Sequence, residues 1–188
     1  MAALLSDFLA AYAPFDKSEL DDITGQFESR KVKKNEIILT EGEVCNQLIF
    51  VNDGCLRLYY VVDEVEITVW FAFGGSSSID IYSFISGLPS TYFIQAIEDS
   101  EIMFLPKSQL DNLYLTNPKI QEMMRKFWED AILTLIERFT ALQKDTAEQR
   151  YLNLLKKPEY LQKIPQKYLA SFIGVTPTSL SRIRKNIR

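Results

Sequence analysis

The spacing of apolar positions divides the chain into an early helical stretch, a β-rich middle and a helical end. Before residue 30, apolar residues recur at helical spacing, and Pro14 separates two short helices, the second over 18–27 with Ser18 as its N-cap. Between about 31 and 106, short runs of β-branched and aromatic residues predict strands separated by turns. The predicted strands cover 36–39, 47–52, 55–62, 66–73, 93–98 and 102–105, with a helical insert over 81–87. Many short strands at such intervals indicate a barrel or a sandwich.

A long helix is predicted from Pro118 to about Lys144, because proline suits the first helical position. The helix is apolar on two sides, and both sides must be buried. One side can cover the β-region, and the simplest partner for the other is the same helix of a second copy. The residues predicted for this dimer helix are Met124, Phe127, Ala131, Leu135 and Leu142. The alternative is that one monomer buries both sides.

The end of the chain predicts a helix, a tight turn and a second helix. The first helix covers 166–173, and Gly174 ends it because glycine adopts the left-handed conformation of a helix C-cap most easily. Thr176 can cap the second helix, and Pro177 fits its first turn. Two helices joined by so short a turn have helix-turn-helix geometry.

Charge is distributed unevenly along the chain and suggests a partner for this end. The net charge is −4, yet residues 144–188 contain ten basic and three acidic residues, a net charge of +7, which leaves −11 for the rest. A basic end on an acidic body indicates a polyanion, and a merely solvated end is the alternative. Small hydroxyls and an arginine on the second helix suit the major groove of DNA. The predicted DNA-contacting residues are Thr176, Thr178, Ser179, Ser181, Arg182, Arg184 and Lys185, with Arg188 following.

Composition argues against most enzyme classes. The sequence has no histidine, which removes the usual general base and the usual zinc and haem ligand. Cys45 and Cys55 supply neither a disulfide framework nor four iron–sulfur ligands, and we interpret them as small hydrophobes, with a bond across a hairpin as the alternative. Without a nucleophile–base pair or a phosphate-cradling glycine loop, we expect no enzymatic activity, no metal and no cofactor. The lack of a long apolar run or a signal-peptide pattern predicts a cytoplasmic protein without membrane contact.

Taken together, these segments resemble the Crp/Fnr family of bacterial regulators over essentially the whole chain. The segment Ala-Ser-Phe-Ile-Gly-Val-Thr-Pro-Thr-Ser-Leu-Ser-Arg-Ile-Arg-Lys at 170–185 resembles the recognition segment of a branch common in Bacteroidetes. Glu-Gly-Glu at 41–43, Asn-Asp-Gly-Cys-Leu-Arg at 52–57 and Ile-Gln-Ala-Ile-Glu-Asp-Ser at 94–100 resemble family turns and strands. Pro177 departs from the best-known relatives, which place a base-reading arginine there.

The resemblance implies an α+β fold in three parts. Residues 1–116 would form a double-stranded β-helix (a jelly roll like a cyclic-nucleotide-binding domain) that acts as a sensor. Residues 117–144 would form the central dimerisation helix, and residues 145–188 the helix-turn-helix DNA-binding domain. The implied function is transcription regulation by a homodimer on an inverted repeat of double-stranded DNA, with RNA polymerase as a further candidate partner. The alternative is a ligand-binding sensor that signals through protein contacts, with little specific DNA binding.

The family's cyclic-nucleotide clamp is incomplete in this sequence. Relatives that bind cyclic AMP use a Gly-Glu pair and an Arg-Ser or Arg-Thr pair, and the matching positions are Ile79-Asp80 and Ser90-Thr91. Without the arginine, a buried cyclic phosphate has no charged partner, which argues against cyclic AMP. An unknown small effector would therefore be the ligand of this pocket. The residues assigned to the pocket are Asp80, Tyr82, Ser90, Thr91 and Tyr92, and the alternative is that their aromatic rings simply fill it.

Overall fold

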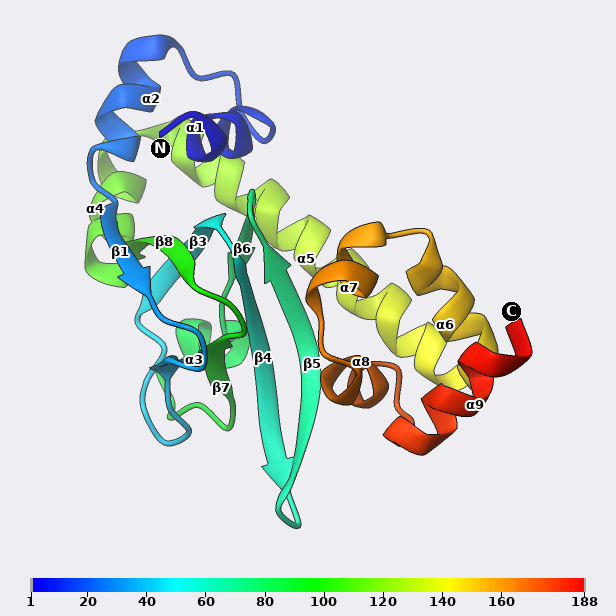
Figure 1. The fold of residues 1–188 in the computed structure, drawn as a ribbon. Helices are drawn as coiled ribbons and strands as arrows, with labels where there is room; N and C mark the ends of the chain where they lie inside the picture. The colour runs from blue at the N-terminus through cyan, green and yellow to red at the C-terminus, as the bar shows by residue number, and fades with distance from the viewer. Residues whose placement is uncertain (1, 188) are drawn as a thin grey trace. The chain divides into compact units, whose positions relative to one another are not determined.

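A computed structural model describes residues 2–187 (Figure 1). The chain forms two compact units. The first unit comprises the residues up to Leu58 together with Phe71–Asp130, and the second comprises Tyr59–Trp70 together with the residues from Ala131 onward. The division crosses a β-hairpin and also the long helix α5, which runs over Pro118–Lys144 as the sequence predicts.

Two four-stranded sheets form the β-roll and confirm the α+β fold class. Their strand orders are β1-β8-β3-β6 and β2-β7-β4-β5. The strands are β1 (Glu28–Val32), β2 (Ile37–Leu39), β3 (Gln47–Asp53), β4 (Cys55–Val62), β5 (Val65–Phe73), β6 (Ser76–Ser78), β7 (Phe93–Ala96) and β8 (Ser100–Pro106). The helices around them are α1 (Ala2–Ala10), α2 (Lys17–Thr24), α3 (Ile81–Ser86) and α4 (Lys107–Thr116).

The structure contains two strands and one helix cap that the sequence pattern did not predict. β1 pairs antiparallel with β8, and β6 pairs antiparallel with β3. Both strands escaped detection because β1 is polar at four of its five positions and β6 consists of three serines. The N-cap of α2 is Asp16 rather than Ser18, because the Asp16 carboxylate accepts a hydrogen bond from Glu19 N (2.9 Å) and Glu19 reaches back to Asp16 N (2.8 Å).

The core of the first unit joins the roll to the first half of α5. The ring of Phe8 lies 5.2 Å from that of Phe50 and 6.0 Å from that of Phe127. Apolar side chains of α1, β3, α4 and α5 surround these rings and leave a void of only about 10 Å³, the space of a single water molecule. Met124 and Phe127 both line this void and are 1% and 7% exposed, so the structure places these two predicted dimer-helix residues inside the monomer.

The second unit combines the tip of the β4–β5 hairpin with the helices at the end of the chain. These helices are α6 (Ala147–Leu155), α7 (Pro158–Lys163), α8 (Gln166–Phe172) and α9 (Pro177–Ile187). The hairpin turn consists of Asp63 and Glu64, with φ values of +47° and +63°. Two consecutive residues with positive φ are typical of the type I′ turn, whose twist matches that of the flanking strands.

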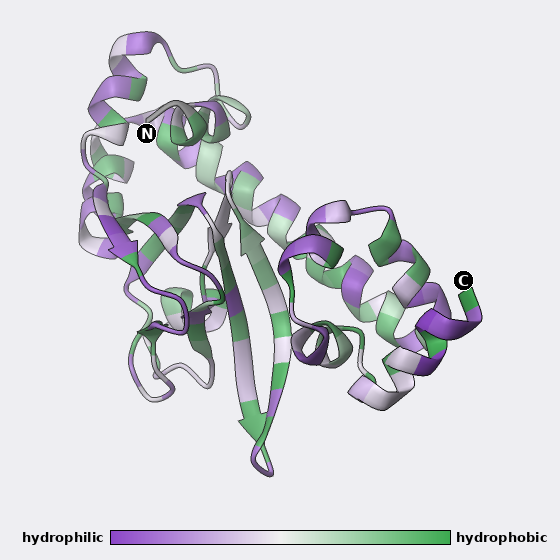
Figure 2. Ribbon diagram, viewed as in Figure 1, coloured by the Kyte–Doolittle hydropathy of each residue, from purple (hydrophilic) through white to green (hydrophobic). Residues whose placement is uncertain are grey.

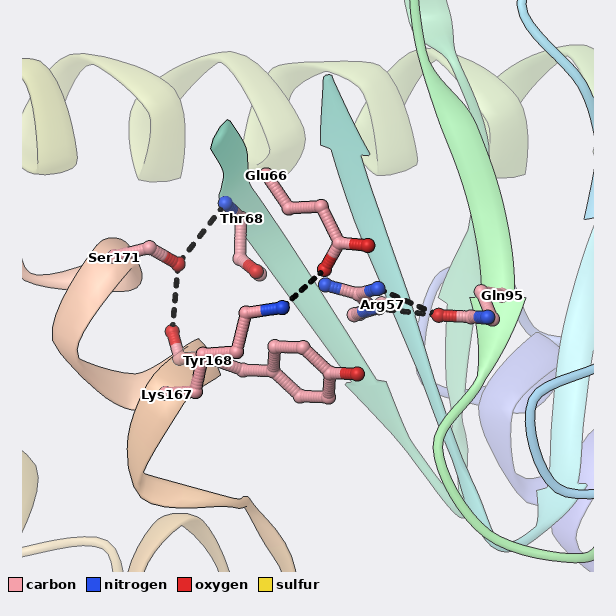
Figure 3. A network of polar contacts seen from close by, with 7 residues as sticks. All are labelled: Arg57, Glu66, Thr68, Gln95, Lys167, Tyr168 and Ser171. Carbon is pink, nitrogen blue, oxygen red and sulfur yellow. Dashed lines mark hydrogen bonds and ion pairs between the residues drawn. The ribbon is translucent and has the colours of Figure 1, made fainter. Parts of the chain in front are cut away.

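Strand β5 of the hairpin contacts α8 directly (Figure 3). The amide of Thr68 donates to Ser171 Oγ (3.2 Å), and the Ser171 hydroxyl in turn donates to Tyr168 O (3.0 Å). Lys167 Nζ lies 3.3 Å from a carboxylate oxygen of Glu66. Because the Lys167 side chain is largely exposed, this ion pair contributes little energy, and the buried amide of Thr68 is the more important contact.

Substitution of Ser171 tests whether this contact holds the hairpin tip in solution. Ser171→Ala removes the acceptor of the Thr68 amide, so we expect hydrogen exchange at Thr68 to become about fivefold faster, the equivalent of about 1 kcal/mol. Ser171→Thr keeps a hydroxyl at the same position and serves as the matched control. Unchanged exchange at Thr68 in Ser171→Ala would show that α8 does not hold the hairpin.

Candidate nucleic-acid interface

The pair α8 and α9 has the helix-turn-helix form that the sequence predicts. Gly174 has a φ of +72°, its amide donates to Ser171 O (3.0 Å), and the amide of Val175 donates to Ala170 O (3.0 Å). These two bonds form a Schellman motif, which ends α8 and turns the chain toward α9. Leu169, Ala170 and Leu180 are buried, and the small side chain of Ala170 allows another helix to approach α8 closely.

Three of the predicted DNA-contacting hydroxyls take part in bonds within the pair. Thr176 caps α9, since its Oγ1 accepts from Ser179 N (3.2 Å) and donates to Ser179 Oγ (3.0 Å). Ser181 Oγ donates to Pro177 O (3.0 Å) and accepts from Gln166 Nε2 (2.6 Å). These hydroxyls therefore already have the local role of fixing the start of α9.

The remaining four predicted residues expose their side chains on α9. They are Thr178, Arg182, Arg184 and Lys185. Arg184 and Lys185 line a solvent-open hollow of about 340 Å³. Ser181, also of α9, and Gln166 of α8 complete its lining. A hollow lined by two cations suits an anion such as a phosphate group, whereas the Gln166 amide donates to Ser181 Oγ and Pro177 O. Arg188 lies outside the described residues.

Two arginines hold the turn of the helix-turn-helix to the preceding helices. Arg150 of α6 donates through Nε to Ile173 O (2.8 Å) and through Nη1 to Asp145 O (2.6 Å). Arg138 of α5 donates through Nη2 to Phe172 O (2.9 Å), and its guanidinium carbon lies 3.6 Å from the centre of the Phe172 ring. Burial lowers the pKa of Arg138 to about 10, with Tyr160 acting in the opposite direction, so Arg138 remains charged at neutral pH.

The second half of α5 exposes a continuous apolar stripe. Its exposed residues are Ile132, Leu133, Leu135, Ile136, Phe139 and Leu142, with exposed fractions between 43% and 63%. Figure 2 shows hydrophobic residues recurring along this part of the helix. Of the predicted dimer-helix residues, Leu135 and Leu142 belong to this exposed stripe and Ala131 is half-buried.

In the β-roll, the two polar residues at the positions of the cyclic-nucleotide clamp satisfy each other. Asp80 and Ser90 are 3% and 2% exposed, and Ser90 Oγ donates to an Asp80 carboxylate oxygen at 2.7 Å. Asp80 also caps α3 by accepting from Ser83 N (3.3 Å). The carboxylate therefore already has partners, and this pair contains no cation to offset a cyclic phosphate. These residues do not fit a cyclic nucleotide held in the family's manner.

The other residues assigned to the effector pocket lie in different surroundings. Tyr82 is 62% exposed, Thr91 is exposed and Tyr92 is half-buried. The structure thus brings Asp80 and Ser90 together but directs Tyr82 and Thr91 toward solvent. A hydroxyl hydrogen bond from Ser83 to Leu88 O (2.6 Å) fixes the segment that follows α3.

Other possible chemical sites are limited in the part of the chain that the structure describes. Cys45 and Cys55 are buried and no disulfide joins them within residues 2–187, and burial raises the pKa of the Cys45 thiol. Those residues contain no group of three or more histidine, cysteine, aspartate or glutamate side chains that could hold a metal ion. None of the described helices has the length and apolar composition needed to cross a membrane.

Sequence reasoning missed Gln166, Arg138 and Arg150. Gln166 follows Pro165, which predicts the start of α8, and only the bond from Gln166 Nε2 to Ser181 Oγ shows that it lies beside α9. Arg138 and Arg150 occupy positions on amphipathic helices where an arginine is usually solvated. Only the folded chain brings their guanidinium groups to the carbonyls of residues 172 and 173.

Known proteins are similar to this chain both in the β-roll and along most of its length. Residues 29–117, which span β1 to α4, match the family described as "Cyclic nucleotide-binding domain". Electron transport regulator A of Shewanella oneidensis is 24% identical over 183 residues, which cover 88% of this chain and 71% of that protein. Regulatory protein HlyX of Actinobacillus pleuropneumoniae is 26% identical over 179 residues, which cover 93% of this chain and 71% of that protein.

The fold is also found among solved structures. A structure described as a transcriptional regulator of the Crp/Fnr family from Eubacterium rectale superimposes with a TM-score of 0.71 at 17% identity. The superposition covers 94% of this chain and 87% of that chain, and an identity this low is evidence for the fold alone. The matched domain, the relatives aligned along nearly the whole chain and the shared fold make this chain similar to regulators of the Crp/Fnr family.

Proposed function

We propose that this protein is a transcription regulator that binds a specific DNA sequence as a homodimer. The observation that carries the proposal is the helix-turn-helix, whose second helix exposes Thr178 and Arg182. An arginine at this place on a recognition helix can donate two parallel hydrogen bonds to a guanine edge in the major groove, and a threonine can contact a neighbouring base. Relatives named as regulators support the same activity for this chain.

The distribution of charge supports DNA as the partner of the helical end. The excess of basic over acidic residues in 144–188, +7 in all, contrasts with a net charge of −11 in the rest of the chain. Cations that neutralise phosphates release counterions, which gives binding that weakens as salt rises. Arg184 and Lys185, beside Gln166, are the residues we assign to phosphate.

The apolar stripe of α5 supports a homodimer. Six large apolar side chains exposed on one helix leave in water a surface that a second copy of the same helix would cover. Two paired helices would present two recognition helices about 34 Å apart, so the site would be an inverted repeat. Bound there, the dimer would act on RNA polymerase.

We infer that an effector, if the roll takes one, is not held by a cyclic-phosphate clamp. The hairpin offers a route for its signal, because β4 and β5 belong to the roll's sheet while Thr68 of β5 contacts Ser171 of α8. An effector would have to bind the DNA-competent and DNA-incompetent forms with different affinity to act in this way.

Replacement of Arg182 tests the proposed function. Arg182→Ala removes the two donors that would read a guanine, so we expect affinity for the selected DNA site to fall by about 1–3 kcal/mol, or roughly 5- to 150-fold in Kd. The loss is measured by fluorescence anisotropy with labelled duplexes. Arg125→Ala removes one exposed arginine from the first unit and serves as the control for charge. If Arg182→Ala bound the site as tightly as the wild type, α9 would not be the recognition helix.

A charge placed in the apolar stripe tests the dimer. Phe139 is 63% exposed, so Phe139→Asp should leave the monomer folded while a buried carboxylate would prevent two copies of α5 from pairing. We expect the wild type to sediment as a dimer and Phe139→Asp as a monomer in analytical ultracentrifugation at micromolar concentration. Thr134→Asp adds the same charge on the opposite side of α5, where Thr134 is exposed, and should remain dimeric. A wild-type monomer, or a dimeric Phe139→Asp, would refute this interface.

A further inference from the structure

Arg150 bridges the end of α5 and the end of α8. Its Nη1 donates to Asp145 O (2.6 Å) just beyond the end of α5, and its Nε donates to Ile173 O (2.8 Å) at the C-cap of α8. The carbonyl groups at helix C-termini lack intrahelical donors and carry partial negative charge, which makes a guanidinium a favourable partner for both. One side chain thus satisfies two helix ends at once.

Gly174 lies beside both this bridge and the apolar stripe. A Cβ added at Gly174 would lie 3.7 Å from Arg150 Nη2 and 3.6 Å from Cδ2 of Leu142. Leu142 is the last member of the exposed stripe on α5. Three features therefore lie close together: the turn that leads into α9, the side chain of Arg150, and the end of the apolar stripe.

Arg138 forms a second connection from within the stripe-bearing part of α5. Its guanidinium stacks on the ring of Phe172 and donates to Phe172 O (2.9 Å), one residue before the carbonyl that Arg150 binds. The ring of Tyr160 lies 5.6 Å from that of Phe172. Two successive carbonyls at the end of α8 are thus each bound by an arginine from a different helix.

We propose that Arg138 and Arg150 are positioning residues that fix the recognition helix relative to the dimer face of α5 and so set the spacing between the two DNA half-sites. This inference rests on the proposed function, since it presupposes an inverted repeat bound by two copies. The residues that face DNA determine which bases each half-site must contain, whereas the two arginines determine the distance between the two half-sites. They do so without touching DNA.

Lysine substitutions separate positioning from a purely stabilising role. A lysine keeps the positive charge at the helix ends, but its single nitrogen cannot reproduce the geometry of a guanidinium that donates from two of its nitrogens. Arg150→Lys should therefore retain most of the stability of the fold while losing the bridge. Arg138→Lys is the second variant, and Arg125→Lys in the first unit is the matched control.

The experiment measures affinity for duplexes that contain the two selected half-sites at the preferred spacing and with one or two base pairs added or removed, and for a duplex with one half-site. In the wild type, a change of one base pair should weaken binding about tenfold, since each base pair shifts and rotates one half-site relative to the other. In Arg150→Lys and Arg138→Lys this penalty should fall below about threefold, with single half-site affinity changed by less than about threefold. Thermal melting confirms that each variant is folded.

Several results would overturn the proposal. One is a loss of the same size at every spacing and at the single half-site, which is what a merely stabilising role gives. Another is a spacing penalty that both lysine variants leave intact, and unfolding of both variants would equally assign the arginines to stability alone. A wild type that selects no DNA sequence would instead refute the proposed function, and this is seen before any variant is made.

Discussion

The exposed apolar stripe on the second half of α5 is the constraint on which this account depends. The first half of the helix is buried within its own unit through Ile120, Met123, Met124 and Phe127, whereas the second half places large side chains from Ile132 to Leu142 in water. Hydrophobic surface of this extent is stable only when something covers it. A second copy of the helix is the partner that also gives the two recognition helices the twofold symmetry of an inverted repeat.

The polar contacts at the DNA-binding end serve geometry more than energy. Thr176 and Ser181 use their hydroxyls to fix the start of α9, and Arg138 and Arg150 fix the turn that precedes it. Thr178 and Arg182 are left exposed on a helix whose position is thereby defined. Polar groups in the β-roll also satisfy each other, because Ser90 donates to Asp80 where the sequence predicted an effector pocket.

Local patterns predicted the elements that depend on apolar periodicity and on turn residues. Gly174 ends α8 and Thr176 caps α9 as expected, and α5 has the predicted bounds. β1 and β6 were missed because their pairing comes from β8 and β3 rather than from their own composition. The arginines were missed for a related reason, since contacts between residues distant in sequence leave no periodic signal. For the same reason the pattern of α5 predicted Met124 and Phe127 on the dimer side of the helix, whereas the core of the monomer encloses both.

Selection of bound duplexes from a randomised DNA library by the wild-type protein, with no ligand added, tests the central claim most directly. The account predicts enrichment of an inverted repeat whose half-sites lie about one helical turn apart, because a symmetric pair of recognition helices can read no other arrangement equally well. Retention of DNA without enrichment of any sequence, in the absence of a ligand and again in the presence of a cell metabolite extract, would contradict it.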